Sequence, residues 1–158
     1  MLIRTSRFQF FCWGIFVGEE SKSDLSDQKR HKDIAIEYFK FVIAGKFREG
    51  LRFFAADCKT HNPYVSGSIE NLGDAMIASS RDLGKQNKEP EFTVKHVLAD
   101  GDFVAVHTEF LNSKSEPSEG GLRQVHLFRF EGNKIVEYRD ITQQVLSDMP
   151  NAGEAFGE

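Results

Sequence analysis

Cysteine is scarce in this chain. Cys12 and Cys58 are the two cysteines among 158 residues, too few and too far apart for a disulfide framework or for the ligands of a zinc site. Disulfide-rich domains belong to oxidising compartments, whereas chains with few thiols fit a reducing cytoplasm. The sequence therefore predicts a cytoplasmic protein.

Positive charge is also in short supply. The 20 Lys and Arg residues are outnumbered by 24 Asp and Glu residues, which gives a formal net charge of -4. The two signs are mixed along the chain, as on a solvated surface. Nucleic-acid binding depends on clustered Lys and Arg that neutralise phosphates. We therefore expect no nucleic-acid partner.

Long hydrophobic runs are missing as well. The apolar run at residues 8–17, FQFFCWGIFV, is too short for a transmembrane helix, which needs roughly 20 residues. No integral membrane span is predicted. The run follows Arg4 and Arg7 and has the length of a signal-peptide core, although it is aromatic and lacks a clear cleavage site. A signal segment would make the protein secreted or periplasmic; the alternatives are an element packed on the domain or an extension outside it.

What the chain does contain is enough apolar material for one globular domain. It is 40% hydrophobic and includes 15 Phe residues, which supply a bulky core. No internal repeat is present. We expect an N-terminal extension over residues 1–26, signal-like or disordered, and a single domain over residues 27–158.

Helical spacing dominates the first half of that domain. Apolar residues such as Ile34, Tyr38 and Val42 recur every three to four positions, which predicts a helix over residues 27–45. The same period continues through Phe47 and Ala55 into a second short helix. A third helix is expected from Asn71, a capping residue type, to residue 84.

From Glu91 onward the apolar period changes to two, which indicates strands. The pairs Asp100-Gly101 and Gly132-Asn133 are hairpin signals, because these residue types accept the positive φ of tight turns. Four antiparallel strands follow, and the fold class is α+β, with helices on one side of a curved, mainly antiparallel sheet. Such a cone has an open end where ligands could bind.

The last hairpin, residues 120–145, carries the densest set of polar groups among apolar ones. One face of its first strand presents His126 beside Phe128, and one face of its second presents Tyr138 beside Asp140. A cavity wall has this pattern, and so does a half-wet sheet. Strict alternation places the following residues of the second strand on the opposite face: Ile135, Glu137, Arg139 and Ile141.

Three stretches resemble the SnoaL-like polyketide cyclases of the NTF2-like superfamily. They are THNPYVSG at 60–67, VLADGDFVAVH at 97–107 and VHLFRFEGNKIVEYRDITQQV at 125–145. The resemblance covers roughly residues 27–156. It implies an NTF2-like cone, a site without cofactor or metal, and a homodimer formed through the sheet face.

The resemblance also implies site residues. His126 stands where the family strand motif, Val-Asp-x-Phe-Arg, carries its acid/base Asp, and Asp140 closes a motif that usually reads Glu-His-Trp-Asp. We expect His126 as base, with Asp140 and His61 as its catalytic partners. The expected substrate contacts are Tyr64, His107, Phe128 and Tyr138. The structural alternatives are a His126 hydrogen-bonded within the sheet, a loop-capping His61, and an Asp140 paired with Arg129 or Arg139.

Two functions follow from this pattern. The first is a cofactor-independent cyclase or isomerase that removes a proton next to a carbonyl group of a small apolar molecule, with His126 as base. The alternative is a non-catalytic module with the same fold that binds a small molecule or assembles as a dimer.

Overall fold

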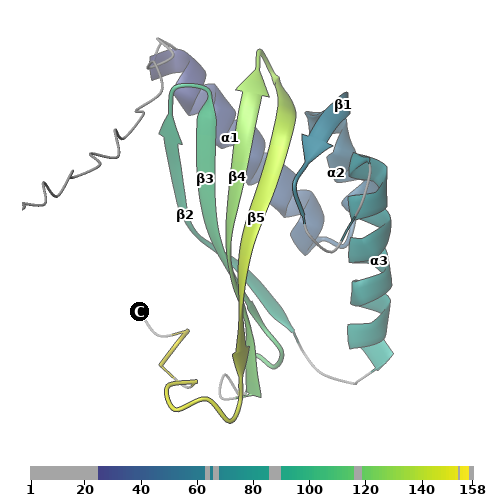
Figure 1. Cartoon of the computed structure of the whole chain (residues 1–158), viewed down its shortest axis with the longest axis vertical. Coiled ribbons are helices and arrows are strands. Elements are labelled where there is room, and N and C mark those ends of the chain that lie inside the picture. Colours follow the sequence, from purple (N-terminus) through teal and green to yellow (C-terminus); the bar gives the residue numbers. More distant parts are fainter. Residues whose placement is uncertain are drawn as a thin grey trace, which may run out of the picture.

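The computed structural model describes residues 25–62, 65, 68–85, 90–115, 119–152 and 154–156. The predicted N-terminal extension therefore lies almost wholly outside the described residues. Figure 1 shows the described elements. They are α1 (Leu25–Ile43), α2 (Phe47–Gly50), the 3-10 helix Leu51–Phe53, β1 (Phe54–Thr60), α3 (Ile69–Lys85), β2 (Glu91–Asp100), β3 (Phe103–Leu111), β4 (Gly120–Glu131) and β5 (Lys134–Leu146).

The strands form one sheet in the order β1-β5-β4-β3-β2. Strands β2 to β5 run antiparallel to their neighbours, and β1 lies parallel to β5 at the edge. Helix α1 crosses one face of the sheet, and α3 stands beside β1 (Figure 1). We call the face toward α1 the inner face and the opposite one the outer face. This arrangement confirms the expected α+β fold with helices packed on a curved, mainly antiparallel sheet.

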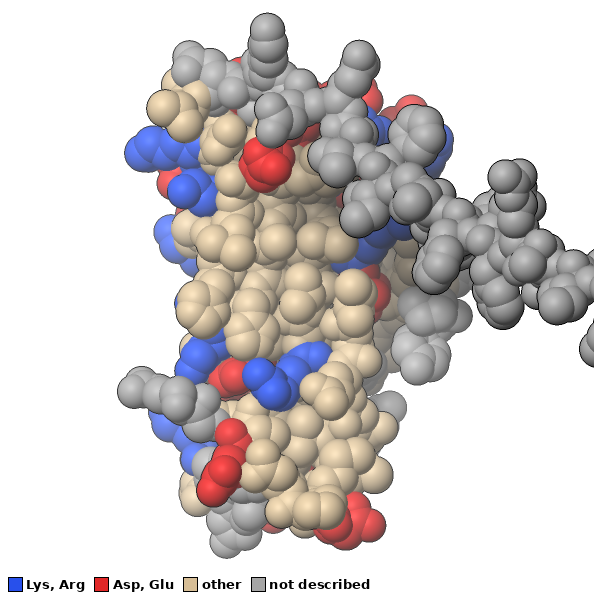
Figure 2. All heavy atoms as spheres, turned by 60° about the vertical axis from the view of Figure 1, so that its left-hand side comes forward, with Lys and Arg blue, Asp and Glu red and all other residues tan. Residues whose placement is uncertain are grey.

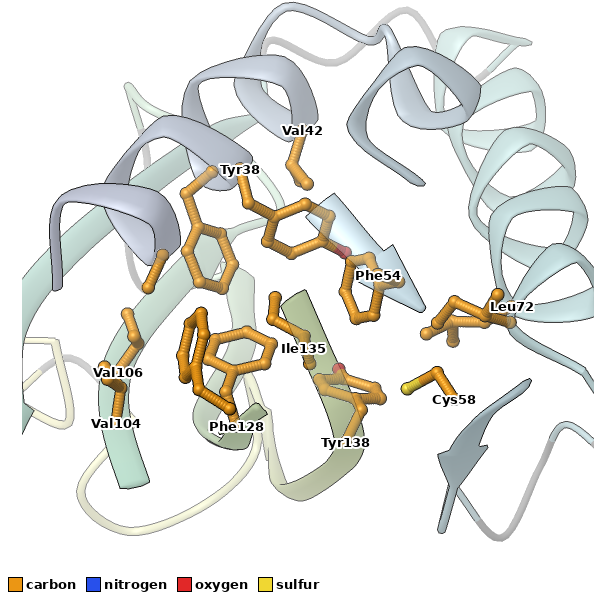
Figure 3. Packing of buried hydrophobic residues seen from close by; sticks show 14 residues of the cluster. Tyr38, Val42, Phe54, Cys58, Leu72, Val104, Val106, Phe128, Ile135 and Tyr138 are labelled. Carbon is orange, nitrogen blue, oxygen red and sulfur yellow. The ribbon is translucent and has the colours of Figure 1, made fainter. Parts of the chain in front are cut away.

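The inner face is filled by aromatic side chains. Helix α1 buries Tyr38 and Phe39 at its centre, and both rings contact Phe128 of β4, with centroids 5.9 and 6.0 Å away. Phe54 and Tyr138 point into the same cluster (Figure 3). Each buried ring of this kind contributes about 1.5–3 kcal/mol relative to an exposed one. The aromatic residues that fill the inner face therefore also hold α1 to the sheet.

Strand β1 departs from the sequence prediction, which continued a helix as far as Ala55. The strand begins at Phe54, directly after the 3-10 helix. Its ladder partner for Phe54 is Ile135, far along the chain, and Phe54 and Cys58 are its two buried residues. A strand specified by such a distant partner leaves no local alternation to detect. The sheet consequently has five strands rather than the four predicted.

Both predicted hairpins form. Gly132 adopts a φ of +58° in the turn between β4 and β5, as its place in Gly132-Asn133 predicts. The earlier turn sits one residue later than predicted: Asp100 still pairs with Phe103, and Gly101, with a φ of +56°, starts the turn.

An irregularity in the last hairpin decides which side chains face α1. Arg129 pairs with Glu137, but Phe130 pairs with Ile135, so Val136 is an extra residue on β5. Such a bulge shifts the alternation by one. Ile135 and Tyr138 are therefore both buried on the inner face, whereas strict alternation wrongly placed Ile135 on the outer one.

Among the described residues, no helix combines the length and the hydropathy needed to cross a membrane.

Candidate functional site

His126 lies at the centre of the sheet, on the inner face of β4. It is 6% exposed. Its Nδ1 is 2.9 Å from the hydroxyl of Tyr138, and its Nε2 is 3.0 Å from Oγ1 of Thr108. In a neutral imidazole one nitrogen donates a hydrogen bond and the other accepts one, and a hydroxyl can be the partner of either because it both donates and accepts. Both nitrogens of His126 therefore have partners from neighbouring strands.

The surroundings of His126 keep it neutral. The ring of Phe39 meets it edge-on with centroids 5.0 Å apart, and burial lowers the pKa of His126 from 6.5 to about 3. The cause is desolvation, which penalises the imidazolium form. At neutral pH the ring is thus an uncharged link between β3, β4 and β5.

The phenol groups of Tyr138 and Tyr38 line the same interior. Burial raises the pKa of both, and the negative charge of Asp140 raises them further. Tyr138 bonds to His126, while the Tyr38 hydroxyl points at the sulfur of Met76, 4.0 Å away. Both phenols stay protonated and can act as neutral hydrogen-bond donors.

Asp140 is the directly opposed partner of His126 in the β4–β5 ladder. Its carboxylate binds elsewhere: the side-chain amide of Asn62 donates to both of its oxygens, at 2.8 and 2.9 Å. The hydroxyl of Thr142 donates to the carboxylate at 3.4 Å and accepts from Gln124 at 3.1 Å. Asp140 is only partly buried, so this polar set lies where the interior meets the surface.

The alternative in which Asp140 pairs with a nearby arginine does not occur. Arg129 and Arg139 both bond to Glu137 on the outer face, and bonds from Arg139 and then Arg129 are the main reason that the pKa of Glu137 falls to about 2. The two arginines therefore neutralise Glu137 and leave Asp140 with neutral donors.

His61 also contacts Glu137 on the outer face. Its Nε2 is 2.9 Å from Oε1 of Glu137, and its side chain is 41% exposed. Glu137 and Asp140 project from opposite faces of β5, so His61 is turned away from His126. The neighbouring Asn62 reaches the inner face instead. The resemblance pointed to His61, the histidine of the His61-Asn62 pair, whereas the amide of Asn62 makes the contact with Asp140.

The other predicted substrate contacts also divide between the inner and the outer face of the sheet. Phe128, fully buried, stacks on Tyr138 with centroids 5.4 Å apart and so belongs to the inner cluster. His107 lies on the outer face of β3 beside His96. Tyr64 lies outside the described residues. The inner face thus gathers four predicted residues: His126, Phe128, Tyr138 and Asp140.

Two hollows open on the surface of the described part of the chain. One, of about 440 Å³, is lined by Arg48, Asp74, Ile77 and Ala78. The other, of about 270 Å³, lies on the outer face and is lined by Phe103, Leu127, Phe128, Arg129, Glu137 and Arg139. Neither is lined by His126 or Asp140. The described residues contain no group of three or more His, Cys, Asp or Glu placed to hold a metal ion.

Comparison with known families matches residues 35–138 of the chain to the SnoaL-like domain. The chain belongs to this SnoaL-like family. Among curated proteins, none matches the chain significantly. The matched range starts within α1 and ends at Tyr138 of β5, so it includes His126, Phe128 and Tyr138 and stops two residues before Asp140.

Solved structures confirm that the SnoaL-like chain has the NTF2-like fold. A SnoaL-like protein of unknown function from Burkholderia thailandensis is 16% identical, with a TM-score of 0.58 over 73% of this chain and 96% of that one. A candidate ketosteroid isomerase from Kribbella flavida is 18% identical, with a TM-score of 0.56 over 84% and 90%. An NTF2-like protein of unknown function from Burkholderia xenovorans is 12% identical, with a TM-score of 0.56 over 84% and 96%.

Proposed function

We propose that this SnoaL-like protein binds a small, largely apolar molecule at the inner end of the sheet, with Asp140 and Asn62 as its polar contacts. One observation carries the proposal: both nitrogens of His126 are taken by hydroxyls, while the Asp140 carboxylate remains partly exposed. The group in the family's acid/base position is closed off, and the neighbouring carboxylate is the one that a ligand can reach.

The chemistry of His126 supports binding rather than catalysis by this residue. A general base needs a lone pair facing the proton that it removes and a pKa near the working pH. His126 has neither, because its nitrogens are occupied and burial holds its pKa near 3. Its role is to position the Tyr138 hydroxyl.

The polar contacts indicate the kind of ligand. The Asp140 carboxylate would accept a hydrogen bond from a hydroxyl or amine group of the ligand, in place of the long bond that Thr142 donates to it. The aromatic surroundings suit an apolar body. We therefore expect a compound with an aliphatic or aromatic skeleton and at least one hydrogen-bond donor.

A thermal-shift screen of hydroxylated apolar compounds on the full chain tests this proposal. A compound that stabilises the wild type should no longer stabilise Asp140→Asn. The carboxylate accepts hydrogen bonds at both oxygens, whereas the amide accepts at one atom and donates at the other. Asp148→Asn, which alters an exposed carboxylate near the C-terminus, is the matched control. Equal ligand-induced stabilisation of Asp140→Asn and the control would contradict the proposal.

A second candidate is a cofactor-independent isomerase or cyclase that uses Asp140 instead of His126. The favouring observation is that Asp140 is the ladder partner of His126, whose Nδ1 is 2.9 Å from the Tyr138 hydroxyl, so a carboxylate and a neutral phenol share the inner face of the sheet. A carboxylate could take the proton next to a carbonyl group while a phenol donates to the enolate oxygen. The candidate ketosteroid isomerase among the structural neighbours fits this class.

Exchange of substrate protons distinguishes the candidates. Incubating each bound compound with the protein in deuterated water should, under the second candidate, place deuterium next to the carbonyl carbon, and Asp140→Asn should abolish the exchange. Binding without exchange or product would leave the first candidate standing and eliminate the second.

We also propose that the protein is a homodimer joined through the outer face of the sheet. Large apolar side chains of this face are exposed: Leu98 by 68%, Phe103 by 54% and Ile141 by 64%. Figure 2 views the molecule from a side with a broad area that has few charged side chains. Apolar surface of this kind is usually covered by a partner, and a second copy is the partner that is always present.

Light scattering of the full chain at micromolar concentration tests the dimer. Ile141→Lys places a charge in the outer face and should give a monomer, whereas Ile43→Lys, at a slightly less exposed apolar position at the end of α1, should leave a dimer. A wild-type monomer would contradict the proposal.

A further inference from the structure

Two histidines face each other on the outer face of the sheet. His96 of β2 is the direct ladder partner of His107 of β3. Their Nδ1 atoms are 3.3 Å apart, and their rings are parallel within 3°, with centroids 5.6 Å apart. The two nitrogens therefore point at each other across the strand pair. Neutral rings in this arrangement share one N–H···N contact, with one proton between two lone pairs.

The far side of the His107 ring faces a carboxylate. Its Nε2 is 3.9 Å from Oε1 of Glu109, which is itself only 6% exposed. Lys95 and Arg123 flank Glu109 at 3.6 and 4.0 Å. A carboxylate at this position favours the tautomer with the proton on Nε2, which leaves the Nδ1 lone pair available. Histidines that bind metals commonly donate their other ring N–H to a carboxylate, and Glu109 lies on that side of the His107 ring, at 3.9 Å and without a hydrogen bond.

We propose that His96 and His107 form a two-nitrogen site for a divalent transition-metal ion. Two imidazole nitrogens bound to one tetrahedral ion, each about 2.0–2.1 Å from it, lie about 3.3–3.4 Å apart. The observed separation already matches this value. A rotation of each ring by about 35° turns the two lone pairs from each other toward one tetrahedral metal position.

The composition of the site selects the ion. Imidazole nitrogen suits Cu²⁺, Ni²⁺ and Zn²⁺, and binding strength for such ligands is greatest with Cu²⁺. His96 is exposed, so an ion can reach the pair from solvent. Since the described residues offer no third protein ligand, water completes the coordination sphere. Such an open site binds an exchangeable ion rather than a permanently held one.

This inference is independent of the function proposed for the inner face. His96 and His107 lie on the opposite face of the sheet from Asp140. They share the outer face with the proposed dimer contact, so the number of bound ions is counted per chain.

Calorimetric titration of CuCl₂ into the full chain tests the site. The expected result is one saturable ion per chain at micromolar affinity, with His96→Ala and His107→Ala each weakening it by about tenfold or more. His61→Ala removes another exposed histidine and should leave the affinity unchanged. Equal affinity in the His96 and His107 variants and in the wild type would overturn the proposal, as would the absence of saturable binding.

Electron paramagnetic resonance of the Cu²⁺-loaded chain identifies the ligands directly. The wild type should show hyperfine coupling from two imidazole nitrogens, and His96→Ala from one. Because His96 is exposed, this variant should keep the fold even if His107→Ala, next to buried Glu109, does not. An unchanged nitrogen pattern in His96→Ala would place the ion elsewhere and refute the assignment.

Discussion

His126 is a structural residue at a position where the resemblance to the cyclases implies a catalytic one. The imidazole contacts two hydroxyls that are buried with it, those of Thr108 and Tyr138. Removing the ring would leave both hydroxyls without a partner in an apolar interior, which costs more than the loss of the hydrogen bonds alone.

Replacing His126 by Ala should therefore destabilise the protein strongly. We expect a loss of about 2–5 kcal/mol in the free energy of unfolding, from the cavity and from the two unpaired hydroxyls. Urea unfolding followed by circular dichroism measures it. Val125→Ala, the preceding residue on the outer face, should cost less than about 1 kcal/mol. Similar values for the two variants would show that the His126 contacts contribute little.

Burial of His126 also predicts a pH dependence. Its pKa is about 3 in the folded protein and 6.5 in the unfolded chain, so between these values the unfolded chain binds the extra proton. Stability from this group is fully present above about pH 6.5 and is lost as the pH falls toward 3.

Comparison with His126→Gln isolates the pH-dependent stability that comes from His126. Unfolding free energies of the wild type and of His126→Gln, measured at intervals from neutral pH down to about pH 4, should converge as the pH falls, because Gln does not titrate. Parallel curves would contradict a neutral buried His126.

At the scale of elements, the close approach of β4 to its neighbours depends on glycine. An added Cβ on Gly121 would collide with the main-chain carbonyl of Phe110 in β3, and that carbonyl cannot move without disturbing the ladder. Gly45, which follows α1 with a φ of +69°, has open space around it.

Gly121→Ala should consequently be far more damaging than Gly45→Ala. The second substitution strains only the backbone, at about 1 kcal/mol, while the first breaks strand pairing and should cost several kcal/mol. Thermal unfolding midpoints of the two variants give the comparison. A Gly121→Ala midpoint at or above that of Gly45→Ala would show that the strands can separate there at little cost.

The elements that sequence reasoning found and missed differ in the range of their contacts. The helical stripe through Tyr38 and the hairpin at Gly132 are local patterns, so they could be predicted. Strand β1 depends on pairing with the distant strand β5, which a local pattern does not record. The extra residue Val136 lies within a local hairpin, but strict alternation has no place for an added residue. The site followed the same division: His126 and Asp140 share one hairpin and were placed together, but the choice between His61 and Asn62 depended on how β1 joins the sheet.

At the scale of the whole molecule, the domain predicted over residues 27–158 should fold without the preceding extension. The described core contains residues from α1 onward. A chain that starts at Leu25 should have the same unfolding midpoint as the full chain within about 2 °C. A large drop in the midpoint would show that the extension packs on the domain.

The parallel pairing of β1 with β5 also has a kinetic consequence. Phe54 meets Ile135 only after a long intervening chain has been closed into a loop, whereas β4 and β5 meet through a two-residue turn. Loop closure of that length is entropically costly, so β1 should join the sheet late in folding and detach early in local opening. Asn62 follows β1 almost directly, so its hydrogen bonds to Asp140 should break when the strand detaches and form again when it rejoins the sheet. Opening of the edge strand β1 would thus determine how often the Asp140 carboxylate is free of Asn62 and able to bind a ligand.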